Sequence, residues 1–441
     1  MFGINNNNIG YVSVYIFSFC AVGAFMPLLG QYLDSIGFTG TQIGSITSAG
    51  AAAAIVASIF WGRVYKKSEN KKRLISKLVL TSAIFCVALY FVNIYIVFLL
   101  MLCVLYFFQA PSVLLLDAMT VEDGLAFGTI RKWGAVGFAL GVFLAGMIAE
   151  YIGLSVIFSI YVISFSIFTV IIYRMSKVAQ RDSLEFPEHE TAGKSTKRVD
   201  DENRINLEVN SDTEIQADLE TQQSFDTQQN FQAQSDFDNK QLSLNTKSKK
   251  TLYKNRKYIN LVVCAFFILG SITANNTYFG FLFVEGGGNL AGIGVAFLLM
   301  AGSEAPFMAW TSKLAKVFTL ERTLLVAILL SVARFAWYAS GPPALLLLIF
   351  FFLQGMTTGI IIVEFVRYIA KVVNEEDLGF AISLYYALGG GLSGIFCQMI
   401  GGILLDHFGA SGVYAFFAIM NFIGACIYMI GRLHKEEAEK K

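Results

Sequence analysis

Twelve apolar stretches follow one another along this 441-residue chain, and each is about long enough to cross a lipid bilayer. A membrane helix needs roughly 20 apolar residues, because the hydrocarbon core is about 30 Å thick. The stretches are continuously apolar rather than alternating, which excludes the strands of a β-barrel. Only 15% of the residues are charged, against roughly 25% in soluble proteins. We therefore expect an all-α membrane protein with twelve transmembrane helices. The predicted spans are residues 9–33, 42–64, 74–92, 94–117, 128–150, 154–174, 257–284, 290–313, 321–340, 343–366, 379–405 and 410–431.

Basic residues near the membrane gather on one side of the predicted bundle. The loops after spans 1, 3, 5, 7, 9 and 11 contain no Lys or Arg, whereas the loops after even-numbered spans are rich in both. These residues include Arg63, Lys66, Lys67, Lys71, Lys72, Arg73, Lys313, Lys316, Arg322, Arg367 and Lys371. Cytoplasmic loops carry such an excess. We therefore expect a multi-pass protein of the cytoplasmic (inner) membrane with both termini in the cytoplasm.

A polar segment divides the chain into two blocks of six spans. Residues 175–256 are rich in Asn, Gln, Asp, Ser and Lys and hold too few apolar side chains to form a core. This composition predicts a disordered cytoplasmic linker. A plain tether is the preferred interpretation, with a regulatory or partner-binding role as the alternative. The other predicted domains are an N-terminal bundle at 1–174, a C-terminal bundle at 257–432 and a cytoplasmic tail at 433–441.

The two blocks share a motif at the end of their fifth span. Residues 145–153 read AGMIAEYIG, and residues 401–409 read GGILLDHFG. Both contain a small pair, an apolar triplet, an acid, an aromatic residue and a glycine at equal spacing. Such a correspondence indicates a parallel internal repeat, in which two six-span bundles are related by an axis normal to the membrane. Glycines within spans 5 and 11 predict close contact between helices.

Several functional classes find no support in the sequence. The six cysteines lie in different spans without metal-ligand spacing and are expected to pack as small apolar residues. None of the three histidines lies deep in a span, so a buried histidine relay is excluded. The sequence contains no nucleophile–base set, phosphate-binding loop or metal cluster. We expect a monomer in the lipid bilayer that is not an enzyme, with no cofactor, no metal and no nucleic-acid partner.

Two charged residues stand well inside otherwise apolar stretches of predicted spans. Glu304 lies in span 8 and Arg334 in span 9, where a charge costs about 2.5–3.5 kcal/mol on insertion scales. Such residues usually face the protein interior or a water-filled cavity. One interpretation is a charge pair that fixes helix packing. The other makes Glu304 a proton carrier that a nearby guanidinium switches while a solute moves through the bilayer.

One stripe of span 5 combines a charge with an aromatic ring. Arg131, Gly134, Phe138 and Gly141 fall on the same face at helical spacing. A guanidinium about two turns below a ring can hold a polar solute by hydrogen bonds and stack on its apolar face. Asp117, near the end of span 4, is the expected partner of Arg131. A salt bridge or gate latch explains this pair about as well as solute binding or coupling.

Two further spans carry polar stripes. These are Ser271, Asn275 and Tyr278 on span 7, and Gln354, Thr357, Thr358 and Glu364 on span 10. Polar groups along one face of a lipid-embedded helix are expected to point at protein or water. Asp34, Glu285 and Asp406 lie at the outer boundary of their spans, where we expect interfacial caps.

Residues 127–138 read FGTIRKWGAVGF. They resemble F/Y-G-R-x-R-x-W/F-G-x-x-G-W/F, the span 5 signature of the major facilitator superfamily in the branch that contains lactose permease, phenylpropionate permeases and nucleoside–proton symporters. Residues 23–44, 302–304 and 331–334 and the end of span 11 are similar to the same branch. The resemblance covers both membrane blocks and omits the linker. It implies a two-domain, twelve-helix carrier.

The resemblance also implies roles for individual residues. Glu304 matches the acid that contacts sugar in lactose permease, and Arg131 matches its substrate-binding arginine. Phe138 matches its stacking aromatic residue, and Arg334 matches an arginine tied to proton coupling.

The chain departs from the family pattern at three places. The His-x-x-Glu pair of span 10 reads Gln354-Gly-Met-Thr357, so the usual proton-carrying glutamate is absent. The lysine region of span 11 is glycine, and the G-x-x-x-D-R/K loop after span 2 has Lys66 in place of aspartate. Coupling would then run through Glu304, Asp117 or Glu364, and a lactose substrate is disfavoured.

We expect a secondary active transporter that moves a small organic solute (a sugar, nucleoside or aromatic acid) by alternating access with proton symport. The site should lie near the midplane between the halves, lined by spans 1, 4, 5, 7, 8, 10 and 11. The first alternative is a proton-independent uniporter or drug efflux carrier, and the second is a membrane receptor or scaffold signalling through the linker. The predicted substrate contacts are Arg131, Phe138, Asn275, Tyr278, Glu304 and Gln354, and the predicted coupling residues are Glu304, Arg334, Asp117 and Glu364.

Overall fold

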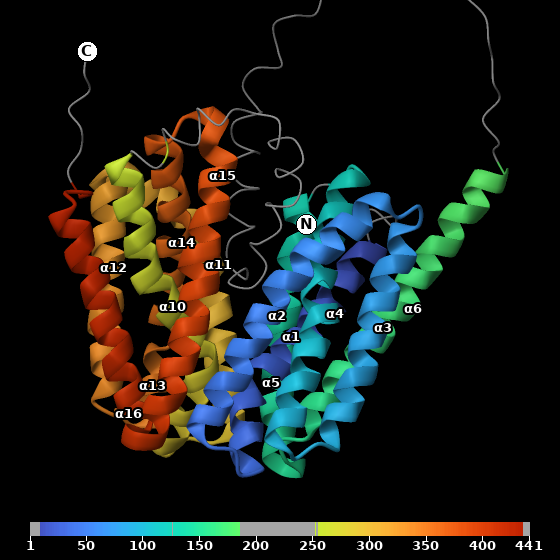
Figure 1. The fold of residues 1–441 in the computed structure, drawn as a ribbon, viewed down its shortest axis with the longest axis horizontal. Coiled ribbons are helices and arrows are strands. Elements are labelled where there is room, and N and C mark those ends of the chain that lie inside the picture. The colour runs from blue at the N-terminus through green and yellow to red at the C-terminus, as the bar shows by residue number, and fades with distance from the viewer. Residues whose placement is uncertain (1–8, 126, 186–251, 253–254, 435–441) are drawn as a thin grey trace, which may run out of the picture.

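The computed structural model describes residues 9–125, 127–185, 252 and 255–434. The greater part of the predicted linker and the tail from 435 onward lie outside the described residues. The described chain is helical almost throughout, and its helices form two bundles that stand side by side (Figure 1). Among these described residues, eleven helices are long and apolar enough to cross a membrane. The fold class predicted from the apolar stretches, an all-α membrane protein, is confirmed.

The N-terminal bundle contains six long helices. They are α1 (Ile9–Ser35), α2 (Gly40–Lys67), α3 (Lys71–Tyr90), α4 (Tyr95–Glu122), α5 (Phe127–Ile152) and α6 (Val156–Glu185). Thr39 and Asn70 cap α2 and α3, because each side-chain oxygen accepts a backbone N–H of the first turn. The last helix differs from expectation. α6 continues to Glu185, whereas the predicted span ends at residue 174. The prediction counted only the apolar stretch, and a helix can continue through polar residues beyond it.

The C-terminal bundle has the same six crossings in more pieces. Its elements are α10 (Arg256–Glu285), α11 (Leu290–Phe318), α12 (Leu320–Ala339), α13 (Ala344–Phe350), α14 (Phe352–Val372), α15 (Glu375–Tyr385), the π-helical η2 (Tyr386–Leu392) and α16 (Ser393–Ile430). Helices α13 and α14 together make span 10. The continuous run through α15, η2 and α16 holds two crossings, which Gly409 separates with non-helical backbone. Counted this way, the described helices make the twelve predicted crossings.

The last glycine of the repeated motif ends a helix in both halves. Gly153 has φ +95° and Gly409 has φ +66°, a conformation that strains residues with a side chain. The equal spacing of the two motifs therefore encodes the same helix stop twice.

Backbones of the two bundles touch directly at one end of the molecule. A Cβ on Gly402 of α16 would lie 2.3 Å from the Gly40 carbonyl oxygen of α2. On the other side of the interface, a Cβ on Gly146 of α5 would lie 2.7 Å from the Leu290 oxygen of α11. Only glycine fits at such distances, so the predicted close helix contact is confirmed. The bundles diverge toward the opposite end, where α1 begins and α16 finishes (Figure 1).

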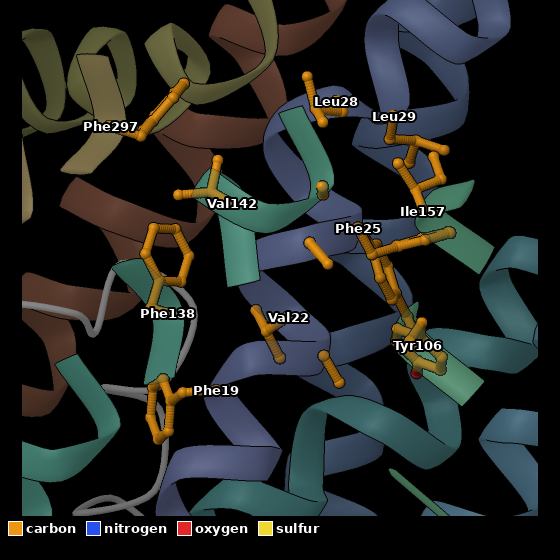
Figure 2. Close-up of a cluster of buried hydrophobic side chains, with 14 of the residues drawn as sticks. Phe19, Val22, Phe25, Leu28, Leu29, Tyr106, Phe138, Val142, Ile157 and Phe297 are labelled. Atoms are coloured by element: carbon orange, nitrogen blue, oxygen red, sulfur yellow. The ribbon is translucent and has the colours of Figure 1, made fainter. Parts of the chain in front are cut away.

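The apolar core continues across the interface between the bundles. Figure 2 shows side chains of α1, among them Phe19 and Phe25, packed with residues of α4, α5 and α6 and with Phe297 of α11. Helix α1 lies close to α5 because Gly137 and Gly141 face the carbonyl oxygens of Ile16 and Cys20. This close contact fixes the positions of aromatic side chains on α1 and α5 that line the cavity described in the next subsection.

Candidate solute-binding site

A cavity lies between the two bundles, with about 1170 Å³ of empty space that includes solvent at its mouth. Small-ligand pockets usually measure about 300–1,000 Å³. All seven spans predicted to line the site contribute to its wall, and α2 adds Thr47. The lining residues are Phe19, Val22, Met26, Pro27, Leu29, Thr47, Tyr106, Gln109, Ala110, Phe138, Ile272, Thr273, Asn276, Thr277, Met300, Glu304, Gln354, Thr358 and Gln398.

Glu304 is the single ionisable carboxyl in this lining, and it is 2% exposed. Its Oε1 atom has no hydrogen-bond partner among the described residues, and the same holds for the hydroxyl of Thr358, another lining residue. A buried polar group without a partner costs about 1–3 kcal/mol, and a charged one costs more. These two groups are therefore placed to gain most from a bound polar solute or from a proton.

Arg334 binds an amide instead of a carboxylate. Its guanidinium donates to the Gln354 Oε1 atom and, at 3.4 Å, to the Ser331 hydroxyl. It also stacks 4.4 Å from the centre of the Phe335 ring. No ion pair joins Arg334 to Glu304 in the part of the chain that the structure describes. The interpretation of these two residues as a charge pair that fixes packing is therefore wrong, because the guanidinium is already engaged by α14.

The Arg334 contact continues into a buried polar chain. The Ser331 hydroxyl donates to Asn421 Oδ1 at 2.9 Å, and Asn421 Nδ2 donates to the Ser271 hydroxyl at 2.6 Å. This chain joins α12, α16 and α10 behind the cavity wall. It fixes Arg334, which in turn orients the Gln354 amide at the cavity surface.

Arg131 and Asp117 form the predicted ion pair, with Nε and Oδ1 3.2 Å apart. The Tyr15 hydroxyl donates to the same Asp117 oxygen at 2.6 Å. The Arg131 guanidinium lies 4.2 Å from the centre of the Phe19 ring. Phe19 and Phe138 line the cavity, whereas Arg131 is not among its lining residues. Sequence reasoning missed Phe19, whose only signal is its place in an apolar span.

Two predicted substrate contacts on α10 face away from the cavity. Asn275 Oδ1 accepts from the Tyr414 hydroxyl at 2.8 Å, and the Tyr278 hydroxyl donates to the Gln398 carbonyl at 2.5 Å. Both side chains thus pack against α16. The neighbouring face of α10, with Thr273 and Asn276, lines the cavity in their place. The structure therefore does not bring Asn275 or Tyr278 to the site.

Glu364 stands apart from the cavity. It is fully buried and forms an ion pair with Arg367 at 3.2 Å on the same helix. Arg367 also donates to the Thr311 hydroxyl of α11 at 3.3 Å. Of the four predicted coupling residues, only Glu304 therefore lines the cavity.

The end at which the backbones of the two bundles touch, called the closed end from here on, carries two related contacts between the bundles. The Asp406 carboxylate accepts from the backbone N–H groups of Gly40 and Thr41, the latter at 2.8 Å. The Glu150 carboxylate accepts from the Leu290 N–H at 2.9 Å. Each acid of the repeated motif thus caps the first turn of a helix in the other bundle, where the helix dipole favours negative charge.

The expected caps are partly confirmed. Asp406 caps α2, and Glu285 accepts from the Ala410 N–H at 3.0 Å within the C-terminal bundle. No cap by Asp34 is formed among the described residues. The cap by Glu150 was missed, although its position in the motif matches that of Asp406.

The sequence of this chain matches a family model over residues 9–416, and the model is described as the MFS_1 like family. The chain belongs to the MFS_1 like family. It is therefore a multi-pass major facilitator superfamily transporter rather than an enzyme.

Curated relatives agree with this assignment. The maltose permease of Geobacillus stearothermophilus is 29% identical over 94% of this chain and 92% of the permease. The uncharacterized transporter YwbF of Bacillus subtilis is 24% identical over 93% of this chain and 90% of YwbF. The probable 3-phenylpropionic acid transporter of Escherichia coli is 29% identical over 34% of this chain and 40% of its own length.

A solved structure shares the fold. The nucleoside transporter NupG matches with a TM-score of 0.70 and 15% sequence identity, over 98% of this chain and all of the NupG chain. At this identity the likeness concerns the arrangement of helices alone.

Proposed function

We propose that this transporter carries a neutral, polyhydroxylated solute of the sugar class. The observation that carries this proposal is the chemistry of the cavity wall, where one carboxyl, Glu304, stands among amides, hydroxyls and aromatic rings. Amides and hydroxyls match sugar hydroxyl groups, and the Phe19 and Phe138 rings match the apolar face of a pyranose. The full-length similarity to a maltose permease supports the same class.

An aromatic acid fits this wall less well. A carboxylate solute needs a cation at the site, but the lining contains no Lys or Arg. Arg131 is engaged by Asp117, and Arg334 is engaged by Gln354. Whenever Glu304 is ionised, it would also repel an anionic solute, because like charges interact strongly in a site of low dielectric. A nucleoside, which is neutral and also stacks on rings, is the second candidate.

We propose that the described conformation is the inward-facing state of the carrier. The end where the bundles diverge carries Lys71 and Lys72 at the start of α3 and Lys371 near the end of α14. The positive-inside rule then assigns that end to the cytoplasm. The Glu150 and Asp406 caps become the outer gate, which opens when the bundles rock about the central cavity.

Glu304 is the proposed proton carrier. Protonation would remove the cost of a buried charge and give the carboxyl a donor for a solute hydroxyl. Asp117 and Glu364 are weaker candidates, because a proton taken up by either would break an ion pair with Arg131 or Arg367. Arg334 contributes by orienting Gln354, which would contact the solute.

Thermal unfolding of the purified protein tests the solute class. A ligand at one hundred times its Kd stabilises the folded state by about 2.7 kcal/mol, so a bound solute raises the Tm. We expect maltose to raise the Tm and 3-phenylpropionate to leave it unchanged. Glu304→Ala should abolish the maltose shift, whereas Glu364→Gln, a change of a buried acid outside the cavity, should keep it. A shift produced by 3-phenylpropionate alone would overturn the proposal, and one produced by uridine alone would favour the nucleoside.

Deletion of residues 186–251 separates transport from signalling. A carrier joined by a tether should keep its uptake rate when the two bundles are linked by a flexible polar segment of similar reach. Loss of uptake together with an unchanged maltose-induced Tm shift would favour a regulatory linker. A chain that binds solute but moves none, with or without residues 186–251, would favour the receptor alternative.

A further inference from the structure

Gln398 of α16 bridges the two bundles at the wall of the cavity. Its Oε1 atom lies 3.1 Å from the Thr47 hydroxyl of α2, whose single proton is shared with the Ile43 carbonyl at 2.9 Å and the Gly44 carbonyl at 3.1 Å. Its Nε2 atom donates to the Thr277 hydroxyl of α10 at 3.0 Å. Thr47 belongs to the N-terminal bundle, whereas Thr277 and Gln398 belong to the C-terminal bundle. All three residues line the cavity.

This bridge belongs to a row of contacts between α2 and α16 that begins at the closed end and continues past Gln398 to Ser48 and the Ile395 carbonyl. Along the antiparallel pair α2 and α16, Thr41 meets Asp406, Gly40 meets Gly402, and Thr47 meets Gln398. Contacts between α2 and α16 therefore form a continuous row from the acid caps to the cavity wall. Any separation of α2 from α16 must break the hydrogen bond between Thr47 and Gln398.

The Gln398 amide has bonding capacity to spare. A carboxamide offers two N–H donors and an oxygen with two lone pairs. The described contacts use one N–H and one lone pair, so one donor and one acceptor are left at the cavity surface. A sugar hydroxyl both donates and accepts, and it can therefore bond to the same amide that holds the gate.

The backbone at this point is fixed. The Tyr278 hydroxyl donates to the Gln398 carbonyl at 2.5 Å, and a Cβ on Gly44 would lie 2.5 Å from that oxygen. Ser48 also donates to the neighbouring Ile395 carbonyl at 3.0 Å. Tyr278 of α10 keeps Gln398 with the C-terminal bundle, whereas the contacts from Thr47, Gly44 and Ser48 of α2 separate when the gate opens.

We propose that Gln398 is a solute-contacting specificity residue whose oxygen is shared between the solute and the outer gate. This inference rests on the proposed transport of a polyhydroxylated solute. In the outward-open carrier, Thr47 has moved away, and Oε1 is exposed to solute arriving from outside. In the inward-open carrier, Thr47 occupies that position. Gln398 thus contributes more to solute affinity on the outer face than on the inner face.

Transport kinetics measured from each face test this assignment. Right-side-out and inside-out membrane vesicles give separate KM values for maltose entering from the outer and the inner face. We expect Gln398→Ala to raise the outer KM roughly tenfold, the effect of about 1.4 kcal/mol of lost hydrogen bonding, and the inner KM by less than about threefold. Thr358→Val, which removes a cavity hydroxyl away from the gate, should raise both KM values by similar factors.

Two further variants separate solute contact from gate closure. Thr47→Val removes the bridge but leaves the amide, so it should lower the inner KM, because Oε1 is then free on that face, and should speed outward return of the empty carrier. Gln398→Asn retains a shorter amide and provides a second folded variant, in which the outer KM should rise more than the inner one. Equal KM changes on both faces, or none, in the two Gln398 variants would overturn the proposal. Failure of the unmodified protein to take up any sugar would instead overturn the proposed function.

Discussion

Asp406 and Thr41 belong to opposite bundles, yet Asp406 Oδ2 accepts both the Thr41 backbone N–H at 2.8 Å and the Thr41 hydroxyl at 2.5 Å. Glu150 makes the corresponding contact with Leu290 at the other side of the interface. The internal repeat therefore does more than duplicate a bundle. It also places one acid of each bundle where the acid caps a helix of the other bundle and can hold the two bundles together at this end.

Neutralising the gate acids should shift the carrier toward its outward-open state. A capping contact is worth about 0.5–2 kcal/mol, so Asp406→Ala should raise the outward-open population roughly twofold to thirtyfold, and adding Glu150→Ala should raise it further. The measurement is the alkylation rate of a cysteine placed at Ser48, which is buried in the closed gate, in a variant without native cysteines.

Glu285→Ala is the matched control for the gate acids. It removes a similar cap, on Ala410, that lies within a single bundle and therefore does not bridge the gate. An alkylation rate that rises equally in Glu285→Ala and Asp406→Ala would show that the caps stabilise helices without holding the bundles together.

Adding a methyl group where glycines of α2 and α16 touch should hinder closure of the gate. The new Cβ in Gly402→Ala would lie 2.3 Å from the Gly40 oxygen, and neither backbone can withdraw without separating α2 from α16. Overpacking of this kind costs about 1–3 kcal/mol, so we expect the uptake rate to fall roughly fivefold or more. Gly302→Ala on α11 is the control, because no heavy atom lies within 4 Å of its added Cβ. Equal uptake by both variants would contradict a closed end built on backbone contact.

Removing Arg334 should weaken solute binding without uncoupling protons. In Arg334→Gln, the Gln354 amide loses the guanidinium that orients it, so the KM should rise while the ratio of protons to solute stays constant. The ratio is measured as external alkalinisation per solute taken up. Gln354→Leu should give the same pattern. A ratio near zero in Arg334→Gln would instead support the coupling role that the family resemblance implies.

The sequence predicts the scaffold well because the scaffold depends on local signals. Apolar length defined the spans, and the shared motif ending at Gly153 and Gly409 revealed the repeat. The pair of Arg131 with Asp117 was also predictable, since a short turn joins their helices. These features require only the spacing of residues within or next to one helix.

The sequence predicts individual contacts of the site less well. Helix α10 carries two polar faces, one with Asn275 and Tyr278 and one with Thr273 and Asn276, and periodicity does not say which face meets the cavity. Arg334 was expected near Glu304 because α11 and α12 are consecutive. Its actual partner, Gln354, was identified as a cavity residue but not as a ligand of the guanidinium, since that pairing depends on how three helices pack.

Proton movement in proteoliposomes tests the central account most directly. Addition of maltose should alkalinise the external medium as sugar and proton enter together. Glu304→Gln should lose accumulation but keep exchange of external for internal sugar, because a neutral side chain binds solute without requiring a proton. Glu364→Gln should accumulate sugar normally. Full accumulation by Glu304→Gln, or sugar uptake without any external pH change in the unmodified protein, would contradict proton symport through Glu304.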